Sequence, residues 1–342
     1  MADPVTAPEM KALVYIGVER LQYSTVPRPV ARPGEDLIRI DASGICGSDM
    51  HAYLGHDERR PAPLILGHEA AGVVVGGADA GRRVTINPLV TCGKCRDCTA
   101  GNTNLCADRQ IISMPPREGA FAEYVTMPSG NLVTVPDHIS LEIAALCEPL
   151  ACGWHAVRRG QAVLGDSLTG LRCVVIGGGA IGVGAALSLA AFGADDITVL
   201  EPNPTRRAAL DKIDGFHAVD PAKTPAAGSI DLVIDGVGYG ATRATASALA
   251  RPGGVIVHIG LGEAEGGLDI RRMTLQEITF IGTYTYTAED FRATAQAIFD
   301  GRLGRLDWLE TRPLAFGQAG FVDIRAGKTA APKIILIPAH EE

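Results

Sequence analysis

The sequence lacks several features that would place it outside the globular enzymes. It has no apolar run of about 18 residues or more, so it predicts no membrane-spanning helix. The N-terminal stretch MADPVTAPEMKALVY has neither the basic segment nor the apolar core of a secretory leader. Aromatic residues make up only 5% of the chain, and positive charge is not in excess, since the 342 residues carry a formal net charge of −8. We therefore expect a cytoplasmic protein with no nucleic acid and no membrane as partner.

Cysteine, by contrast, is well represented, and half of the eight cysteines crowd into one short stretch. The spacing C-x2-C-x2-C-x7-C is formed by Cys92, Cys95, Cys98 and Cys106. Short spacings of this kind let one loop supply four thiolates to a tetrahedral zinc ion, with no coordination position left open. The pattern predicts a structural zinc site; free buried cysteines or a redox pair are the alternative.

The pattern of apolar runs and turn residues along the chain predicts an α/β protein of two domains, with a C-terminal segment that rejoins the first domain. Residues 1–154 carry short β-like runs at 37–40, 72–75 and 121–126, separated by turn residues. Residues 155–287 alternate strand and helix, which favours a doubly wound parallel sheet of the Rossmann type. The expected strands are 171–176, 197–200, 230–235, 255–259 and 278–281, and the expected helices are 180–191, 205–211 and 241–250. Residues 288–342 add a helix at 288–301 and a strand at 333–337, which we expect to rejoin the first domain.

A glycine motif opens the second domain. Residues 177–182 read GGGAIG, the pattern G-x-G-x-x-G, between an expected strand and an expected helix. Glu201 ends the next strand, where a carboxylate accepts hydrogen bonds from ribose hydroxyls and repels a 2′-phosphate, so NAD is favoured over NADP. Arg206 and Arg207 follow closely, and a guanidinium there could stack on adenine or attract a phosphate. The expected cofactor contacts are Gly177, Gly179, Ile181, Gly182, Glu201 and Arg206.

Three further fragments carry metal-ligand and proton-transfer side chains. They are GICGSDMH at residues 44–51, GHE at 67–69 and CEPL at 147–150. Each is weak alone, because a single cysteine or histidine is more often a packed or hydrogen-bonded structural residue. Their joint occurrence with the cysteine loop and the glycine motif is what points to a catalytic site.

In these motifs and their order the sequence resembles the medium-chain dehydrogenase/reductase family, in its zinc-containing alcohol dehydrogenase branch. The resemblance covers nearly the whole chain and implies a β-rich, GroES-like catalytic domain with two zinc ions per chain. Glu148 stands where the best-known alcohol dehydrogenases carry cysteine, and in this it is similar to polyol and threonine dehydrogenases. The resemblance also implies a homotetramer or a homodimer.

The same resemblance implies a role for each site residue. Cys46 and His68 would bind the catalytic zinc, with Glu69 or Glu148 as the third protein ligand, and one open position would remain for substrate. An alcohol oxygen would be activated there as its carbon loses a hydride to the nicotinamide. Ser48 and His51 would pass the alcohol proton outward. Together with Glu69, they are the expected catalytic residues.

Two departures weaken an assignment to sorbitol itself. Ala52 stands where the sorbitol dehydrogenases that this sequence resembles often carry an aromatic residue, and Thr285 stands where they often carry an arginine. Other polyols, sugar acids, cyclitols, diols and amino alcohols stay open as the small-molecule alcohol substrate, and the expected lining residues are Phe121, Trp154, His155 and Tyr284. The favoured function is oxidation of a secondary alcohol of a polyol by NAD. The alternatives are a threonine-type dehydrogenase and a zinc- and nucleotide-binding protein without turnover.

Overall fold

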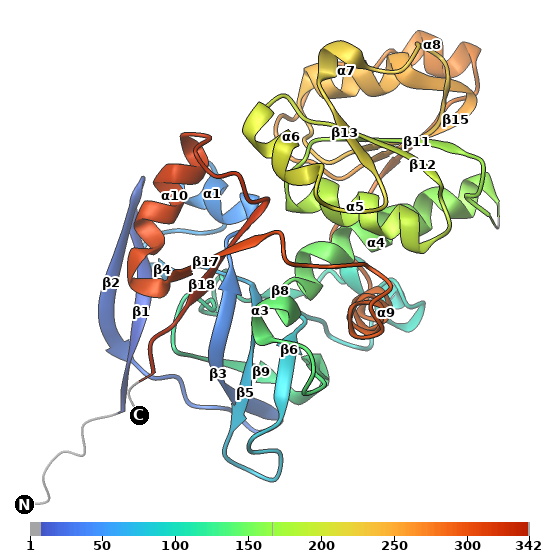
Figure 1. Ribbon diagram of the computed structural model, residues 1–342. Helices are drawn as coiled ribbons and strands as arrows, with labels where there is room; N and C mark the ends of the chain where they lie inside the picture. Colours follow the sequence, from blue (N-terminus) through green and yellow to red (C-terminus); the bar gives the residue numbers. More distant parts are fainter. Residues whose placement is uncertain (1–7, 166, 341–342) are drawn as a thin grey trace, which may run out of the picture.

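A computed structural model describes residues 8–165 and 167–340, which form two lobes (Figure 1). In Figure 1 the nucleotide lobe, drawn from green to orange, lies above the β-rich lobe, which contains the blue N-terminal strands and the red C-terminal segment. Within these two ranges, no helix has both the length and the hydropathy that a bilayer span requires.

The nucleotide lobe is a six-stranded parallel sheet, as the alternating pattern predicts. Its spatial order is β13-β12-β11-β14-β15-β16, the order 3-2-1-4-5-6 of a dinucleotide-binding fold. The strands are β11 (Arg172–Ile176), β12 (Asp196–Leu200), β13 (His217–Val219), β14 (Ile230–Asp235), β15 (Ala250–His258) and β16 (Thr279–Gly282). The helices that connect them are α5 (Ala180–Ala191), α6 (Pro204–Leu210), α7 (Gly240–Leu249) and α8 (Ile270–Leu275). The expected fold class is confirmed.

Most element boundaries differ from the expected ones by a few residues, for local reasons. Helix α6 begins at Pro204 because the Asn203 side chain accepts the first free N–H groups of that helix. Helix α7 ends at Leu249, since Ala250 already belongs to β15. The run expected at 121–126 becomes β9 (Tyr124–Pro128), because the backbone of Phe121 pairs instead with Leu13 and Leu66.

The β-rich lobe holds one small and one larger sheet. The small sheet has the order β2-β1-β4, with β1 (Glu9–Gly17), β2 (Arg20–Pro27) and β4 (Leu64–Ile65). The larger has the order β10-β6-β5-β3-β18-β17, and β9 also pairs with β3. Its strands are β3 (Glu35–Gly44), β5 (Glu69–Val75), β6 (Arg83–Ile86), β10 (Leu132–Thr134), β17 (Leu309–Pro313) and β18 (Lys333–Ile337). Shorter elements are β7 (Leu89–Val90), β8 (Gln110–Ile111), α1 (Gly47–Tyr53), α2 (Arg96–Thr99), α3 (Leu141–Ala144) and α10 (Gly317–Arg325).

One long helix joins the two lobes. Helix α4 (Cys147–Leu164) runs continuously through the position where residues 154 and 155 were expected to divide two domains. It packs so closely on α5 that a Cβ on Gly153 would lie 2.4 Å from the backbone nitrogen of Ala185. The CEPL fragment forms the first turn of this helix, where proline costs little. Helix α9 (Ala288–Phe299) packs against α4 from the other side.

The C-terminal segment lies within the larger sheet of the β-rich lobe. Strand β18 pairs antiparallel with β3, so that Ile335 lies opposite Gly44, and it pairs in parallel with β17. Strand β3 also pairs with β5, which places Gly44 opposite Glu69. The first residue of β18, Lys333, is therefore brought next to Glu69 across 264 positions of sequence.

Candidate active site

A cavity of about 290 Å³ lies between the two lobes. The β-rich lobe contributes Cys46, Ser48 and His51, and helix α4 contributes Glu148. The other wall is built by residues at and just beyond the carboxyl ends of β14 and β15, among them Val237 and Ile259. Ligands of doubly wound sheets bind beyond these strand ends, so the cavity lies where the fold places a cofactor and its substrate.

Cys46 and His68 line this cavity, and their ligand atoms lie together with that of Glu69. The Sγ, the imidazole nitrogen and the carboxylate oxygen all lie within 4.8 Å of one another. Cys46 is the residue before α1, and Glu69 is the first residue of β5. A thiolate, an imidazole and a carboxylate in this arrangement form a donor set for zinc with a fourth position left for another ligand.

Asp49, which the sequence analysis did not single out, holds the two segments of this group together. Its Oδ2 accepts the backbone N–H of Cys46 at 3.1 Å, and its Oδ1 accepts that of Gly67 at 3.2 Å. The same Oδ1 lies 3.3 Å from Nδ1 of His68, which leaves Nε2 as the ligand nitrogen. Burial alone would lower the pKa of His68, but Asp49 and Cys46 raise it well above its usual value. The position of Asp49 within GICGSDMH, three residues after Cys46, is the signal that could have revealed it.

Replacing Asp49 by asparagine is expected to weaken zinc binding at this group about 10- to 100-fold, because the amide no longer offers His68 a charged acceptor. Competition with a chromogenic chelator measures the affinity. Asp137→Asn, at a fully exposed carboxylate, is the matched control. An affinity that stays within twofold of the native protein would show that Asp49 does not orient the ligand histidine.

Cys46, His68 and Glu69 form the metal-ligand group, and Glu69 is also paired with a buried lysine. Nζ of Lys333 lies 2.6 and 2.7 Å from the two carboxylate oxygens and donates to the carbonyl of Ile45 at 2.8 Å. Both side chains are buried, and although burial lowers the pKa of Lys333, Glu69 raises it above its ordinary value. Gly44 makes room for this pair, since a Cβ there would lie 2.1 Å from a Glu69 oxygen. Sequence reasoning missed Lys333, because a lysine before an apolar strand has no distinctive pattern.

Glu148 lines the cavity but stands outside the group of Cys46, His68 and Glu69. The hydroxyl of Tyr286 donates to its Oε1 at 2.7 Å. Burial raises the pKa of Glu148 to about 7, with Glu69 acting in the same direction. The geometry therefore favours Glu69 over Glu148 as the third protein ligand.

Ser48 and His51 both face the cavity from α1. Oγ of Ser48 lies 3.4 Å from Nε2 of His68, at the metal-ligand group. His51 follows three residues later on the same face of the helix. Arg60, a buried residue absent from the sequence prediction, donates to the carbonyl of Ser48 at 3.1 Å and so fixes the start of α1.

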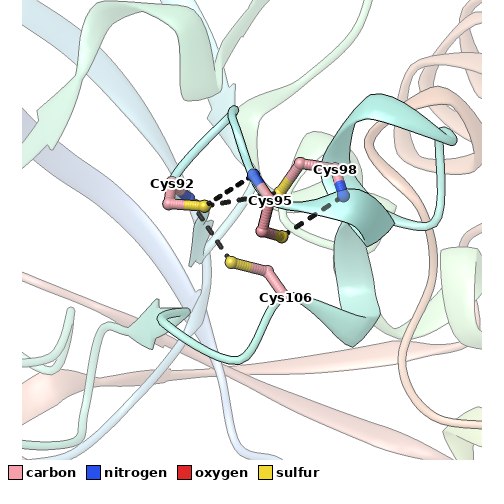
Figure 2. A group of neighbouring side chains, drawn as sticks. All are labelled: Cys92, Cys95, Cys98 and Cys106. Atoms are coloured by element: carbon pink, nitrogen blue, oxygen red, sulfur yellow. Dashed lines mark hydrogen bonds between the residues drawn. The ribbon is translucent and has the colours of Figure 1, made fainter.

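The four clustered cysteines converge as their spacing predicts (Figure 2). Their sulfur atoms lie within 4.8 Å of one another, around the short helix α2 and the 3-10 turn at Thr103–Leu105. Backbone N–H groups of Lys94 and Cys95 lower the pKa of Cys92. A thiolate is the form that binds zinc, so this loop favours the ligand state of that cysteine. The four-sulfur donor set fits a closed, structural zinc site.

The glycine motif has the conformation that a pyrophosphate site requires. Gly177 has a φ of +100°, and a Cβ on Gly182 would lie 1.8 Å from the carbonyl oxygen of Gly177. Gly179 is the N-cap residue before α5 and faces open space, so the first N–H groups of that helix are available to a phosphate. Ile181, which belongs to the motif, lines the cavity together with Cys46 and His68.

Glu201 is buried beside this motif and shapes it directly. Its Oε2 accepts the backbone N–H of Gly178 at 2.9 Å, and its Oε1 accepts that of Asn203 at 2.8 Å. Arg207 is engaged by Asp220 at 3.0 Å, whereas Arg206 reaches the carbonyl of Thr329 in the β-rich lobe at 3.4 Å. Of the two arginines that complicated the choice of cofactor, Arg206 is the one with a buried nitrogen, Nε, that lacks a partner among the described residues.

Of the four expected lining residues, Tyr284 alone lies on the cavity wall. The prediction was wrong for the other three because they pack elsewhere: Trp154 against Phe192, Phe121 against Phe321, and His155 on the carboxylate of Asp290. Ala52 is also buried away from the cavity. Thr285 does line it, with a φ of +45° that is rare for a β-branched residue.

A dinucleotide-binding sheet joined to a β-rich lobe with a Cys-His-Glu group is the architecture of a metal-dependent dehydrogenase. Two family descriptions match: "Alcohol dehydrogenase GroES-like domain" at residues 32–137 and "Zinc-binding dehydrogenase" at residues 180–300. The chain therefore belongs to the zinc-dependent medium-chain alcohol dehydrogenase family, in its polyol branch. The family resemblance and the prediction of an oxidoreductase are both confirmed.

Individual relatives agree with this placement. The chain is 31% identical to a probable D-xylulose reductase A of Aspergillus clavatus, over 96% of this chain and 97% of the relative. It is 34% identical to sorbitol dehydrogenase of Bacillus subtilis, over 82% of this chain and 84% of the relative. The crystal structure of L-idonate 5-dehydrogenase from Escherichia coli aligns with a TM-score of 0.84 and 25% identity, over 96% of this chain and 98% of that one.

Proposed function

We propose that the protein oxidises a secondary alcohol of a polyol, or of a closely related hydroxy compound, to a ketone with zinc and NAD. The observation that carries this proposal is the grouping of Cys46, His68 and Glu69 beside a cavity that is also lined by Ile181 of the glycine motif. The relatives named for D-xylulose, sorbitol and L-idonate support the substrate class.

The proposal assigns one zinc ion to Cys46, His68 and Glu69 and a second to the four clustered cysteines. Bound zinc supplies a Lewis acid that lowers the pKa of the alcohol, and NAD supplies the hydride acceptor. The other steps belong to the chain itself. Asp49 holds His68 in the tautomer that presents Nε2, and Lys333 holds the Glu69 carboxylate in place.

Ser48 and His51 are proposed to move the proton of the alcohol. Ser48 is close enough to the metal-ligand group to accept a hydrogen bond from a substrate hydroxyl placed there. His51 is a half-buried histidine three residues later on the same helix, and its imidazole can take up and release a proton. Arg60 fixes the carbonyl of Ser48, which restricts the orientation of this residue.

NAD is proposed as the cofactor because the Glu201 carboxylate stands where a 2′-phosphate would bind and because Arg207 is already neutralised by Asp220. We also propose a cytoplasmic location, and a homotetramer or homodimer as the family resemblance implies. The proposed partner is a small alcohol, with neither nucleic acid nor membrane.

The test is NADH formation by the zinc-loaded protein on polyols, sugar acids and 2-amino-3-hydroxy acids. Turnover of polyols or sugar acids is expected, with at least tenfold lower kcat/KM when NADP replaces NAD and with loss of activity after chelation. Glu201→Ala should reduce the ratio of kcat/KM with NAD to kcat/KM with NADP, because it removes the carboxylate that repels the 2′-phosphate. Turnover confined to amino-hydroxy acids would favour a threonine-type enzyme. NAD binding without any turnover would favour a protein that kept the fold and lost the chemistry.

A further inference from the structure

Two adjacent arginines of the cavity wall share a single carboxylate. Nε and Nη2 of Arg59 lie 2.8 and 2.9 Å from the two oxygens of Asp57, and Nη1 of Arg60 lies 3.0 Å from Oδ2. The Arg60 side chain is 2% exposed, whereas that of Arg59 is 60% exposed. Arg59 therefore presents the outer guanidinium of this cluster to the cavity and to solvent.

The cluster of Asp57, Arg59 and Arg60 carries a net charge of +1, from two guanidinium ions and one carboxylate. Although burial raises the pKa of Asp57, hydrogen bonds from Arg59 lower it below its ordinary value, so the carboxylate stays ionised near neutral pH. Among the described residues that line the cavity, Glu148 is the one carboxylate, and it lies at the metal end beside Tyr286. The Arg59 end of the cavity is therefore not neutralised by an acidic lining residue.

Arg59 also has donors to spare. A guanidinium offers five N–H donors, and Asp57 uses the Nε and Nη2 side of this one. Nη1 has no hydrogen-bond partner among the residues that the structure describes. The edge formed by Nη1 and Nη2 can donate two parallel hydrogen bonds to a carboxylate, a geometry that lysine cannot reproduce.

This cationic edge is connected to the reacting end of the cavity. Arg60 bonds both to Asp57 and to the carbonyl of Ser48, whose hydroxyl lies at the metal-ligand group. Tyr284 lines the same cavity and carries the guanidinium of Arg109 over its ring at 4.8 Å. Ser48 and Arg59 both line this cavity, so a small molecule that fills it can contact the two side chains at once.

We propose that the substrate is a hydroxy carboxylate of the sugar-acid type, whose carboxylate binds Arg59 while a hydroxyl several carbons away is oxidised beside Ser48. This inference rests on the proposed function and narrows its substrate class. Arg59 acts here as a specificity residue and takes no part in the chemistry. A single net positive charge matches a carboxylate better than a doubly charged phosphate ester, so a phosphorylated polyol is expected to be the poorer substrate.

The experiment compares substrates that differ only in a terminal carboxylate or CH2OH group: gluconate with sorbitol, idonate with iditol, and xylonate with xylitol, plus sorbitol 6-phosphate. In at least one pair the acid is expected to have a kcat/KM at least tenfold higher. Arg59→Gln should raise KM for that acid about tenfold with kcat within twofold, and should leave KM for the neutral partner unchanged. Arg59→Lys should restore only part of the loss.

Arg305→Gln is the matched control, because this exposed arginine also pairs with an aspartate two residues away but lies outside the cavity. Equal or better use of the neutral alcohol in every pair, or an unchanged KM in Arg59→Gln, overturns the inference and leaves the proposed function intact. Preference for the phosphate ester over the acids also overturns it. If no alcohol is oxidised, the proposed function fails, but the anion site can still be tested by the quenching of bound NADH fluorescence on addition of gluconate. Gluconate binding that is present in the native protein and lost in Arg59→Gln supports the site. Absence of gluconate binding to the native protein contradicts it.

Discussion

Replacing Lys333 by methionine is expected to lower the free energy of unfolding of the zinc-free protein by about 3–5 kcal/mol. The Lys333 ammonium ion is the buried cation that neutralises Glu69, with contacts of 2.6 and 2.7 Å to both carboxylate oxygens. Methionine has a similar volume but leaves a completely buried carboxylate without a counterion. Urea unfolding followed by circular dichroism, with and without zinc, measures the effect.

Two controls separate this cause from a general packing defect. Lys328→Met changes an exposed lysine five positions earlier and should shift stability by less than about 0.5 kcal/mol. Combining Lys333→Met with Glu69→Gln should recover much of the lost stability, because the buried charge is then removed as well. Zinc should also recover part of it, since Glu69 would then face a cation again. A single variant as stable as the native protein would mean that Glu69 is neutral when Lys333 is absent.

Replacing Cys46 by alanine is expected to remove one of two zinc ions per chain and to lower kcat/KM by about a thousandfold or more, with the fold retained. Loss of the Lewis acid forfeits several kcal/mol of charge stabilisation in the transition state, and each 1.36 kcal/mol is a factor of ten in rate. Elemental analysis of the dialysed protein gives the zinc content, and NADH formation gives the rate.

Cys95→Ala provides the complementary measurement. It should remove the other zinc ion and destabilise the loop at 92–106, because a closed four-thiolate site contributes its binding energy to folding. Cys173→Ala, at a buried cysteine of β11 that belongs to neither group, should keep both ions. Retention of two zinc ions in Cys46→Ala would contradict the assignment of that residue as a ligand.

Much of the nucleotide lobe could be predicted from local patterns. The alternation of apolar strands and helices predicts the parallel sheet, and the spacing GGGAIG marks a strand-to-helix turn that a phosphate can approach. Helix α4 was missed, because its first turn contains Pro149 and Glu148 and reads locally as a loop. Phe121 and Trp154 were misplaced for a related reason: a single aromatic residue has the same local signature in a core as in a cavity wall.

The sequence alone determined the chemistry that is available: four closely spaced cysteines for one metal site, a cysteine and a histidine for another, and a glycine turn for a dinucleotide. The cysteine cluster and the glycine turn are local properties, since spacing along one loop or one turn fixes which atoms can meet. Cys46 and His68 lie on separate segments, and only the family resemblance pointed to them as a pair. The tertiary structure places the Glu69 carboxylate beside Cys46 and His68 by strand pairing, whereas the Glu148 carboxylate accepts a hydrogen bond from Tyr286. It also decided that Lys333 meets Glu69 and that Arg59 and Arg60 line the same cavity as Ser48. Such contacts depend on how β18 returns to β3 and how a loop folds over α1, and spacing along the chain does not encode them.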